Sequence, residues 1–269
     1  MSKAAIEPAS RPNPFAGAAA HSAYAEWRGG RLVQPLRRGA VAPPGASRAH
    51  GMFRAHVLGE DFSCVGARIA VRNNTYRFGL YGPMNTPEAT AGLAHDLFEY
   101  ERERPSFATD FATYVACFGG PQVNDESEWE RVLWSQLQSL HELDSPHHAW
   151  DASVSSDPEA ADFSFSIAGT AFFVVGLHPA SSRLARRFPL PALVFNAHEQ
   201  FDRLREGGEF ERVRAAVRAR DYRLQGSLNP NLSDYGERSE ARQYSGRAVE
   251  EGWRCPFRAL WKKVEGPEG

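Results

Sequence analysis

The chain has only three cysteines, Cys64, Cys117 and Cys255, and they stand far apart in the sequence. Because they are few, widely spaced and without a CxxC pair, they exclude both a disulfide framework and a zinc ribbon. The CxxCH sequence that attaches c-type haem covalently is missing as well. This cysteine usage is typical of the reducing cytoplasm, where we expect the protein to act.

Long apolar runs and a strong net charge are missing too. No run approaches the roughly 20 apolar residues that a membrane span requires. The Ala- and Pro-rich start of the chain lacks the apolar core of a signal peptide. The formal net charge of -2 gives no reason to expect nucleic acid or an anionic membrane as a partner. We therefore expect a protein that binds neither.

The residues that are present suffice for a globular domain with a buried core. The chain has 269 residues, of which 42% are hydrophobic and 24% charged, as in an ordinary soluble domain. Residues 1–22 are rich in Ala, Pro and Gly, a composition that predicts a mobile tail. We expect residues 23–269 to form a single domain. The prolines and arginines within residues 33–47 indicate a loop.

Helical and strand patterns alternate along the rest of the chain. Thr86, Pro87 and Glu88 predict a helix start, because they supply an N-cap, a proline and an acidic first turn. Residues 126–143 have the 3-and-4 apolar spacing of an amphipathic helix, and two apolar strands around residues 168–170 indicate a hairpin. These patterns predict an α+β fold, a single domain with a largely antiparallel sheet flanked by helices. Other expected elements are helices over 64–73, 86–103 and 210–222 and strands over 75–81 and 106–118.

The most informative segment runs from residue 171 to residue 201. One apolar strand leads into His178, a second short strand ends at His198, and Arg183, Arg186 and Arg187 lie between the two histidines. A turn or a solvated loop explains each residue taken alone. Together, two histidines at strand ends and a cationic loop predict the wall of a site for an anionic ligand.

The same segment resembles the YqcI/YcgG family, in the branch with the pattern G-L-H-P-x-x-S-R-x-x-R-R-F followed by L-V-F-N-x-H-x-Q-F. The likeness covers about residues 53–257 and includes N-P-N-L-S-D-Y-G, S-E-A-R-Q-Y-S-G and W-R-C-P-F. Upstream, D-F-S-C-V-G-A resembles the family's F-P-C-x-x-(G/A) segment, with Ser63 in place of the usual proline. The resemblance implies a haem protein, because members of known activity, in the D-cycloserine and guanitoxin pathways, use haem to N-hydroxylate arginine or a related guanidine.

With that resemblance, Cys64 is the first candidate for the axial ligand of a non-covalently bound haem b. An axial thiolate donates electron density that favours O–O cleavage. The predicted helix after Cys64 is expected to lower the pKa of the thiol through its N–H groups and dipole. The structural alternative is an inert core cysteine. His178, and after it His198, are the competing ligands, and either histidine would alternatively transfer protons on the substrate side.

Charged residues of the same motifs suit the other parts of such a site. Arg183, Arg186 and Arg187 would bind the haem propionates or the carboxylate of an amino acid, unless they form a solvated basic loop. A guanidinium substrate needs a carboxylate partner, which Glu240 or Asp234 would supply from a dense polar run. For each of these two residues a plain surface loop is the alternative.

The sequence contains neither a GxGxxG dinucleotide fingerprint nor a cysteine cluster for iron–sulfur. Electrons would therefore come from a separate redox partner, or peroxide would replace them. We expect a haem-dependent N-oxygenase, a monooxygenase that hydroxylates a guanidine or amine nitrogen in a specialised-metabolite pathway, with L-arginine as the first substrate to test. The alternatives are a haem-binding or haem-sensing protein without oxygenase activity, a haem-free regulator, and an N-oxygenase of an aryl or alkyl amine.

Overall fold

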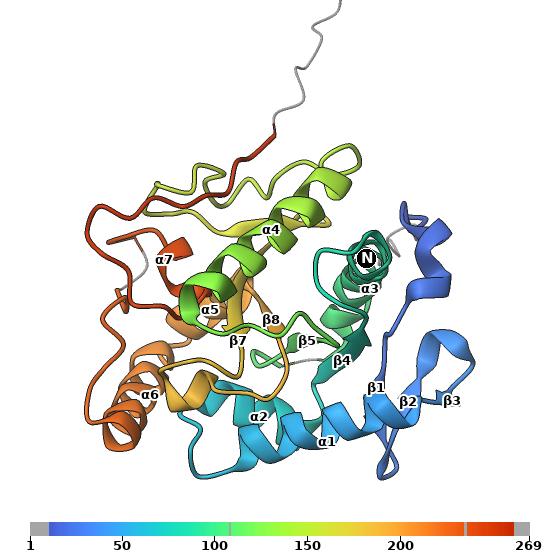
Figure 1. The fold of residues 1–269 in the computed structure, drawn as a ribbon, viewed down its shortest axis with the longest axis horizontal. Coiled ribbons are helices and arrows are strands. Elements are labelled where there is room, and N and C mark those ends of the chain that lie inside the picture. Colours follow the sequence, from blue (N-terminus) through green and yellow to red (C-terminus); the bar gives the residue numbers. More distant parts are fainter. Residues whose placement is uncertain (1–10, 108, 234–235, 261–269) are drawn as a thin grey trace, which may run out of the picture.

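A five-stranded sheet runs through the middle of the protein (Figure 1). The computed structural model describes residues 11–107, 109–233 and 236–260. The strands are β4 (Tyr76–Tyr81), β5 (Thr113–Phe118), β6 (Phe165–Ile167), β7 (Thr170–Leu177) and β8 (Ala192–Ala197). They lie in the order β4, β5, β8, β7, β6; the first pair is parallel and the other three pairs are antiparallel. The predicted α+β fold with a largely antiparallel sheet is therefore confirmed.

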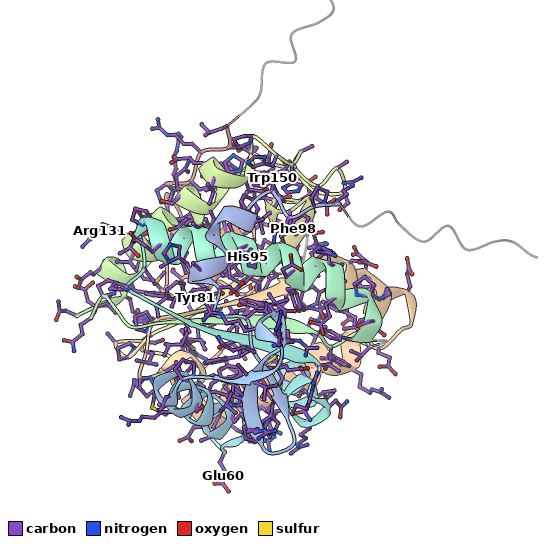
Figure 2. The ribbon with its side chains drawn as sticks, turned by 90° about the vertical axis from the view of Figure 1, so that its right-hand side faces the viewer. Glu60, Tyr81, His95, Phe98, Arg131 and Trp150 are labelled. Atoms are coloured by element: carbon purple, nitrogen blue, oxygen red, sulfur yellow. The ribbon has the colours of Figure 1, made fainter. Side chains whose placement is uncertain are left out.

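Helices cover both faces of this sheet. Helices α3 (Pro87–Glu103) and α4 (Glu126–Asp144) lie on one face, and α1 (Pro44–Leu58) and α2 (Val65–Asn73) lie on the other (Figure 1). Figure 2 shows the same layers from the side, with Phe98 on the α3 side and Glu60 at the opposite end of the molecule. The site described below lies on the α2 face.

The alternation of side chains along β5 explains why two cores form. Tyr114 and Phe118 belong to the apolar cluster that contains the buried residues of α3 and α4. Val115 and Cys117 belong to the cluster that contains the buried residues of α1 and α2. Because successive side chains of a strand point to opposite faces, a fully apolar strand contributes to both clusters. Each large apolar side chain buried in this way contributes roughly 1.5–3 kcal/mol.

The helix starts and the hairpin follow the local signals in the sequence. The Thr86 side chain accepts a hydrogen bond from the Ala89 N–H at 3.3 Å, as predicted, and the predicted helix over 126–143 forms as α4. Ala168 and Gly169 both have positive φ, 55° and 78°, as a tight turn between β6 and β7 requires. These predictions are confirmed. The predicted strand over 106–118 is too long, because residues 104–107 form the 3-10 helix η3 (Arg104–Phe107) before β5 begins.

The predicted loop over residues 33–47 is wrong. This range contains the end of β2 (Arg31–Gln34), the short 3-10 helix η2 (Pro35–Arg37) and β3 (Ala40–Val41), and the two strands form a small antiparallel sheet with β1 (Glu26–Arg28). Helix α1 begins directly after it, at Pro44. The prolines stand at element starts, where a missing N–H is tolerated, so they do not break these elements.

The predicted mobile tail is also wrong for residues 11–22, while residues 1–10 lie outside the described residues. Phe15 is buried in the core, and the 3-10 helix η1 (Ala16–His21) packs on α3. Gly92 of α3 permits this contact, because a Cβ there would lie 2.4 Å from the His21 carbonyl oxygen. The Ala23 N–H then donates to the buried Asp96 carboxylate at 2.7 Å. Tyr81 and the neighbouring His95, both labelled in Figure 2, bind the same carboxylate.

Among the described residues, no helix is both long and apolar enough to cross a membrane.

Candidate functional site

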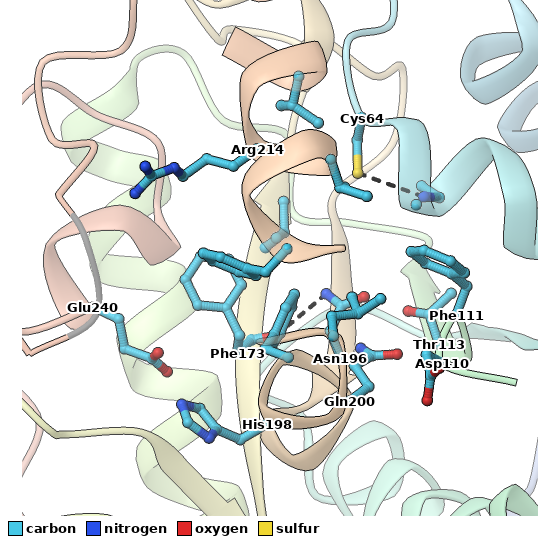
Figure 3. A pocket seen from close by; sticks show the side chains of 18 of the residues that line it. Cys64, Asp110, Phe111, Thr113, Phe173, Asn196, His198, Gln200, Arg214 and Glu240 are labelled. Atoms are coloured by element: carbon cyan, nitrogen blue, oxygen red, sulfur yellow. Dashed lines mark hydrogen bonds between the residues drawn. The ribbon is translucent and has the colours of Figure 1, made fainter. Parts of the chain in front are cut away.

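A pocket of about 290 Å³ lies on the α2 face of the sheet (Figure 3). Its walls come from the start of α2, strands β7 and β8, helix α5 (His198–Glu206) and helix α6 (Phe210–Gln225). Glu240, just before the short helix α7 (Ala241–Tyr244), closes another side. Most of the lining is apolar, and its apolar residues include Phe111, Phe173, Val175, Phe201, Val213 and Val217. A concave, mainly apolar pocket with a few polar groups is typical of a small-molecule site.

Cys64 occupies the N-cap position of α2 and lines this pocket. Its Sγ accepts a hydrogen bond from the Ala67 N–H at 3.5 Å. Burial raises the pKa of the Cys64 thiol, although the N–H groups of Ala67 and Gly66 and the Arg186 charge oppose that shift. The expected lowering of this pKa is therefore wrong for the ligand-free pocket, because loss of hydration outweighs the helix terminus. The predicted position at a helix N-terminus is confirmed.

His198 also lines the pocket, at the point where β8 passes directly into α5. The imidazole is buried, with 4% of the residue exposed, and its Nδ1 lies 3.4 Å from the Asp202 carboxylate. Burial lowers the pKa of His198, against the opposing effect of Asp202. The ring is consequently neutral at pH 7 and able to accept a proton.

Glu240 places a buried carboxyl group in the pocket wall. Its Oε1 accepts hydrogen bonds from the Ser164 hydroxyl and the Tyr244 hydroxyl, both at 2.6 Å. Burial raises the pKa of Glu240 to about 8, and the two hydroxyl donors only partly offset that effect. The surface-loop alternative for Glu240 is thus excluded. Asp234, the other carboxylate considered, lies outside the described residues.

His178 lies on the opposite face of the sheet from this pocket. Phe173 and Val175 of β7 line the pocket, whereas His178 stacks on Trp129 of α4, with ring centroids 5.0 Å apart. The imidazole is fully buried, neither ring nitrogen has a hydrogen-bond partner, and burial lowers its pKa to about 4. The structure therefore does not bring His178 together with Cys64 and His198. Strand alternation turns His178 toward α4 and away from this pocket, and its role as an alternative axial ligand stays a prediction.

Arg183, Arg186 and Arg187 are not among the described residues that line the pocket. Arg183 binds the Asp221 carboxylate and the Ser227 carbonyl oxygen, which ties its loop to α6 and the residues after it. Arg187 donates to the Ser181 carbonyl oxygen at 2.8 Å. Neither residue lines this pocket, so the predicted contacts of the two arginines with a propionate or a substrate carboxylate stay predictions.

Arg186 is the last residue of the 3-10 helix η4 (Leu184–Arg186), and of the three arginines it is the one whose charge acts on Cys64. Its guanidinium donates to the Tyr244 carbonyl oxygen at 3.0 Å, and its charge acts on Cys64. Burial lowers the pKa of Arg186 to about 10, so it stays charged at pH 7. We assign it a supporting position behind the pocket, not a ligand contact.

Replacing Arg183 by Ala is expected to lower the free energy of unfolding by about 1.5–3 kcal/mol, because it removes charge-assisted hydrogen bonds to Asp221 and Ser227. Urea unfolding would measure the loss, and ligand binding at a temperature where the variant is folded should be unchanged. Arg187→Ala is the matched control, because its guanidinium binds backbone oxygens at the surface. If Arg183→Ala instead lost much of its ligand affinity at an unchanged free energy of unfolding, Arg183 would be a ligand-binding residue.

The sequence analysis missed the arginines that do line the pocket. Arg214 and Arg218 lie one turn apart on α6, and Arg205 and Arg238 line the pocket as well. Arg205 and Arg214 also bind Asp202 and Glu211, respectively. The sequence of the basic helix did contain a signal. Val213 and Val217 are one turn apart, so when this face of α6 turns toward the pocket, the adjacent Arg214 and Arg218 come to the pocket as well.

Two further residues that line the pocket are Asn196 and Gln200. Together with His198 they form the N-x-H-x-Q part of the sequence, in which only the histidine was considered as a site residue. Asn196 is the penultimate residue of β8 and Gln200 lies in the first turn of α5. The direct passage from strand to helix places all three around one pocket, where Figure 3 shows them together.

The comparisons with known proteins agree with the motifs. The model of the YqcI/YcgG family matches residues 53–258, which is more than half of the chain. Searches of curated proteins and of solved structures found no match. The matched range contains every residue of the pocket described above. The chain therefore belongs to the YqcI/YcgG family.

Proposed function

We propose that this protein is a haem-dependent N-oxygenase that hydroxylates a guanidine or amine nitrogen, with L-arginine as the first substrate to test. One observation carries the proposal. A single apolar pocket has the thiol of Cys64 at one end and the buried carboxyl group of Glu240 at the other (Figure 3). The thiol suits an iron ligand and the carboxyl group suits a cationic nitrogen.

The residues around Cys64 fit a haem. Aromatic and aliphatic side chains make most of the pocket lining, as an apolar macrocycle requires. Cys64 would hold the iron, and Arg214 and Arg218 would bind the propionates in place of the three arginines first considered. No CxxCH sequence exists, so the group would be haem b held without a covalent bond. When bound, haem supplies the activation of oxygen or peroxide.

The groups at the other end of the pocket suit an amine or guanidine substrate. A cationic nitrogen beside Glu240 would favour the ionised carboxylate, which then neutralises the charge of the substrate in the apolar surroundings. Neutral His198, held near Asp202, would accept a proton from the substrate nitrogen as it is hydroxylated. Electrons would come from a separate redox partner, or peroxide would replace them, because the sequence contains no dinucleotide fingerprint.

The absorption spectrum of the purified protein tests this proposal most directly. We expect a Soret band after expression with ample haem, and a carbonyl complex of the thiolate type in the reduced form. A protein without a Soret band under these conditions would contradict the proposal. A Soret band without oxygen transfer to any amine would instead favour a haem-binding or haem-sensing protein.

The aromatic lining also favours a second candidate substrate class. Phe111, Phe173 and Phe201 would contact an aryl or alkyl amine as readily as the side chain of arginine. Mass spectrometry of a panel of amines, read as the gain of one oxygen atom, would distinguish the classes. If an aryl amine gains oxygen and L-arginine does not, the N-oxygenase activity is supported and the guanidine is not the substrate.

A further inference from the structure

Two uncharged amide side chains, Asn196 and Gln200, face the pocket beside His198 (Figure 3). Gln200 is buried, with 5% of the residue exposed, and Asn196 is half-buried. An amide has a donor end and an acceptor end, and the hydrogen bonds it already makes determine which end faces a ligand. Both amides make such bonds to the surrounding backbone.

The orientation of Asn196 is set by two backbone carbonyl groups. Its Nδ2 donates to the Phe173 carbonyl oxygen at 3.3 Å and to the Val194 carbonyl oxygen at 3.5 Å. Carbonyl oxygens only accept hydrogen bonds, so the nitrogen end must face them. The oxygen end of Asn196, Oδ1, is therefore the end presented to a ligand.

Gln200 has the opposite orientation. Its Oε1 accepts a hydrogen bond from the Ala112 N–H at 3.1 Å, at the entrance to β5. Because an N–H only donates, the oxygen end of Gln200 must face Ala112. The Nε2 group, with two hydrogens, is the end that this bond leaves for a ligand. The pocket thus combines a fixed acceptor on Asn196 with a donor on Gln200.

We infer that Asn196 is a specificity-determining residue, whose Oδ1 accepts a hydrogen bond from an N–H group of the ligand, while Gln200 donates to an oxygen or nitrogen acceptor on the same molecule. The ligand is then a small polar molecule with both kinds of group, such as an amino acid with a guanidine or urea side chain. This inference rests on the proposed function only in taking this pocket as the substrate site. Neither amide carries a charge, so this recognition does not require a cationic ligand.

That last point separates the role of Asn196 from the role of Glu240. L-Arginine and L-citrulline differ mainly in that arginine has a charged guanidinium and citrulline a neutral urea, and both groups carry N–H donors. Loss of Asn196 should weaken the binding of both compounds. Loss of the Glu240 charge should weaken the binding of L-arginine alone, because only arginine brings a charge that the carboxylate neutralises.

Isothermal titration calorimetry of the purified full-length protein tests the inference with L-arginine and L-citrulline as probes. We expect Asn196→Leu, which keeps a similar side-chain size, to raise the Kd for both compounds about tenfold, equivalent to about 1.4 kcal/mol. Asn73→Leu is the matched control, because Asn73 is an exposed residue at the end of α2, outside the pocket lining, and its Kd values should equal those of the parent protein. Thermal unfolding would verify that each variant is folded, and Asn196→Ala serves if the leucine does not fit.

The outcomes are distinct. Parent-like affinity of the Asn196 variants for both compounds overturns the inference, and so does failure of the parent protein to bind either compound. Weakened binding of L-arginine alone also overturns it, because Asn196 would then act through the charge. If the protein lacks a Soret band but binds both compounds in a way that depends on Asn196, the proposed haem chemistry is contradicted. The inference about Asn196 is then still supported.

Discussion

Replacing Cys64 by Ser is expected to abolish the thiolate-type spectrum of the haem-loaded protein and its N-oxygenase turnover while the protein still folds. The thiol is the candidate iron ligand in the pocket, and a serine hydroxyl does not replace a thiolate as a donor of electron density. Folding should survive, because serine is a preferred N-cap residue and its hydroxyl would accept the bond from the Ala67 N–H that Sγ now accepts. Absorption spectroscopy of the reduced carbonyl complex and turnover assays would measure both effects.

Cys255→Ser is the control for this experiment. Cys255 is partly buried like Cys64 but does not line the pocket, so its variant should keep the parent spectrum. If Cys64→Ser also keeps a thiolate-type spectrum and normal turnover, Cys64 is not the ligand. His198→Ala is then the next variant to examine, because His198 lines the same pocket and His178 lies across the sheet.

The second large effect concerns the stability of the ligand-free protein as a function of pH. Glu240 has a pKa of about 8 in the folded protein, above its ordinary value of 4.5. Between these two values the folded protein holds a proton that the unfolded chain has released. The free energy of unfolding should therefore fall as pH rises, by about 1.4 kcal/mol per pH unit from this group at most. This contribution is complete below pH 4.5 and is lost as pH rises through 8.

Glu240→Gln should remove that dependence, because a glutamine has no proton to lose. Urea unfolding of both proteins at pH 5.5 and pH 8 would measure it, and the difference between the proteins cancels the contributions of the other titrating groups. We expect the advantage of the glutamine variant to be larger at pH 8 than at pH 5.5. An equal difference at both pH values would show that Glu240 titrates normally.

The same variant should bind a cationic ligand more weakly. L-Arginine is expected to shift the haem spectrum of the resting protein, and Glu240→Gln to reduce its affinity about tenfold or more, because the buried charge of the guanidinium loses its partner. Titration of the spectral change above pH 8, where the parent carboxyl group is ionised, would give the clearest comparison. Unchanged affinity in the glutamine variant would place the guanidinium elsewhere.

Local signals in the sequence were reliable where the structure depends on neighbouring residues. Thr86 and Asp125 cap helices because an N-cap bond spans only three residues. The hairpin at Gly169 and the helix start at Cys64 have the same local origin. The fold class followed from these elements together, since alternating hairpins and helices leave few arrangements.

Predictions were wrong where the structure depends on distant partners. Residues 11–22 have the composition of a tail, but Phe15 is buried in a core made by residues far along the chain. The charge of Arg183 predicted a contact with an anionic ligand. In the structure its guanidinium binds Asp221 and Ser227, which are 38 and 44 residues away in the sequence. Residue type defines what a side chain is able to bind, and only the packed chain determines which partner comes within reach.

The sequence by itself determined the family, the α+β class and the types of chemical group available, because these depend on composition, local pattern and motif. It also placed Cys64 at a helix start and His198 at a strand end. The tertiary structure decided which groups share a pocket. His178 and Val175 are only three residues apart, yet His178 packs on α4 and Val175 lines the pocket together with Cys64. The reason is that a strand turns successive side chains to opposite faces, and the helices that cover each face come from elsewhere in the chain.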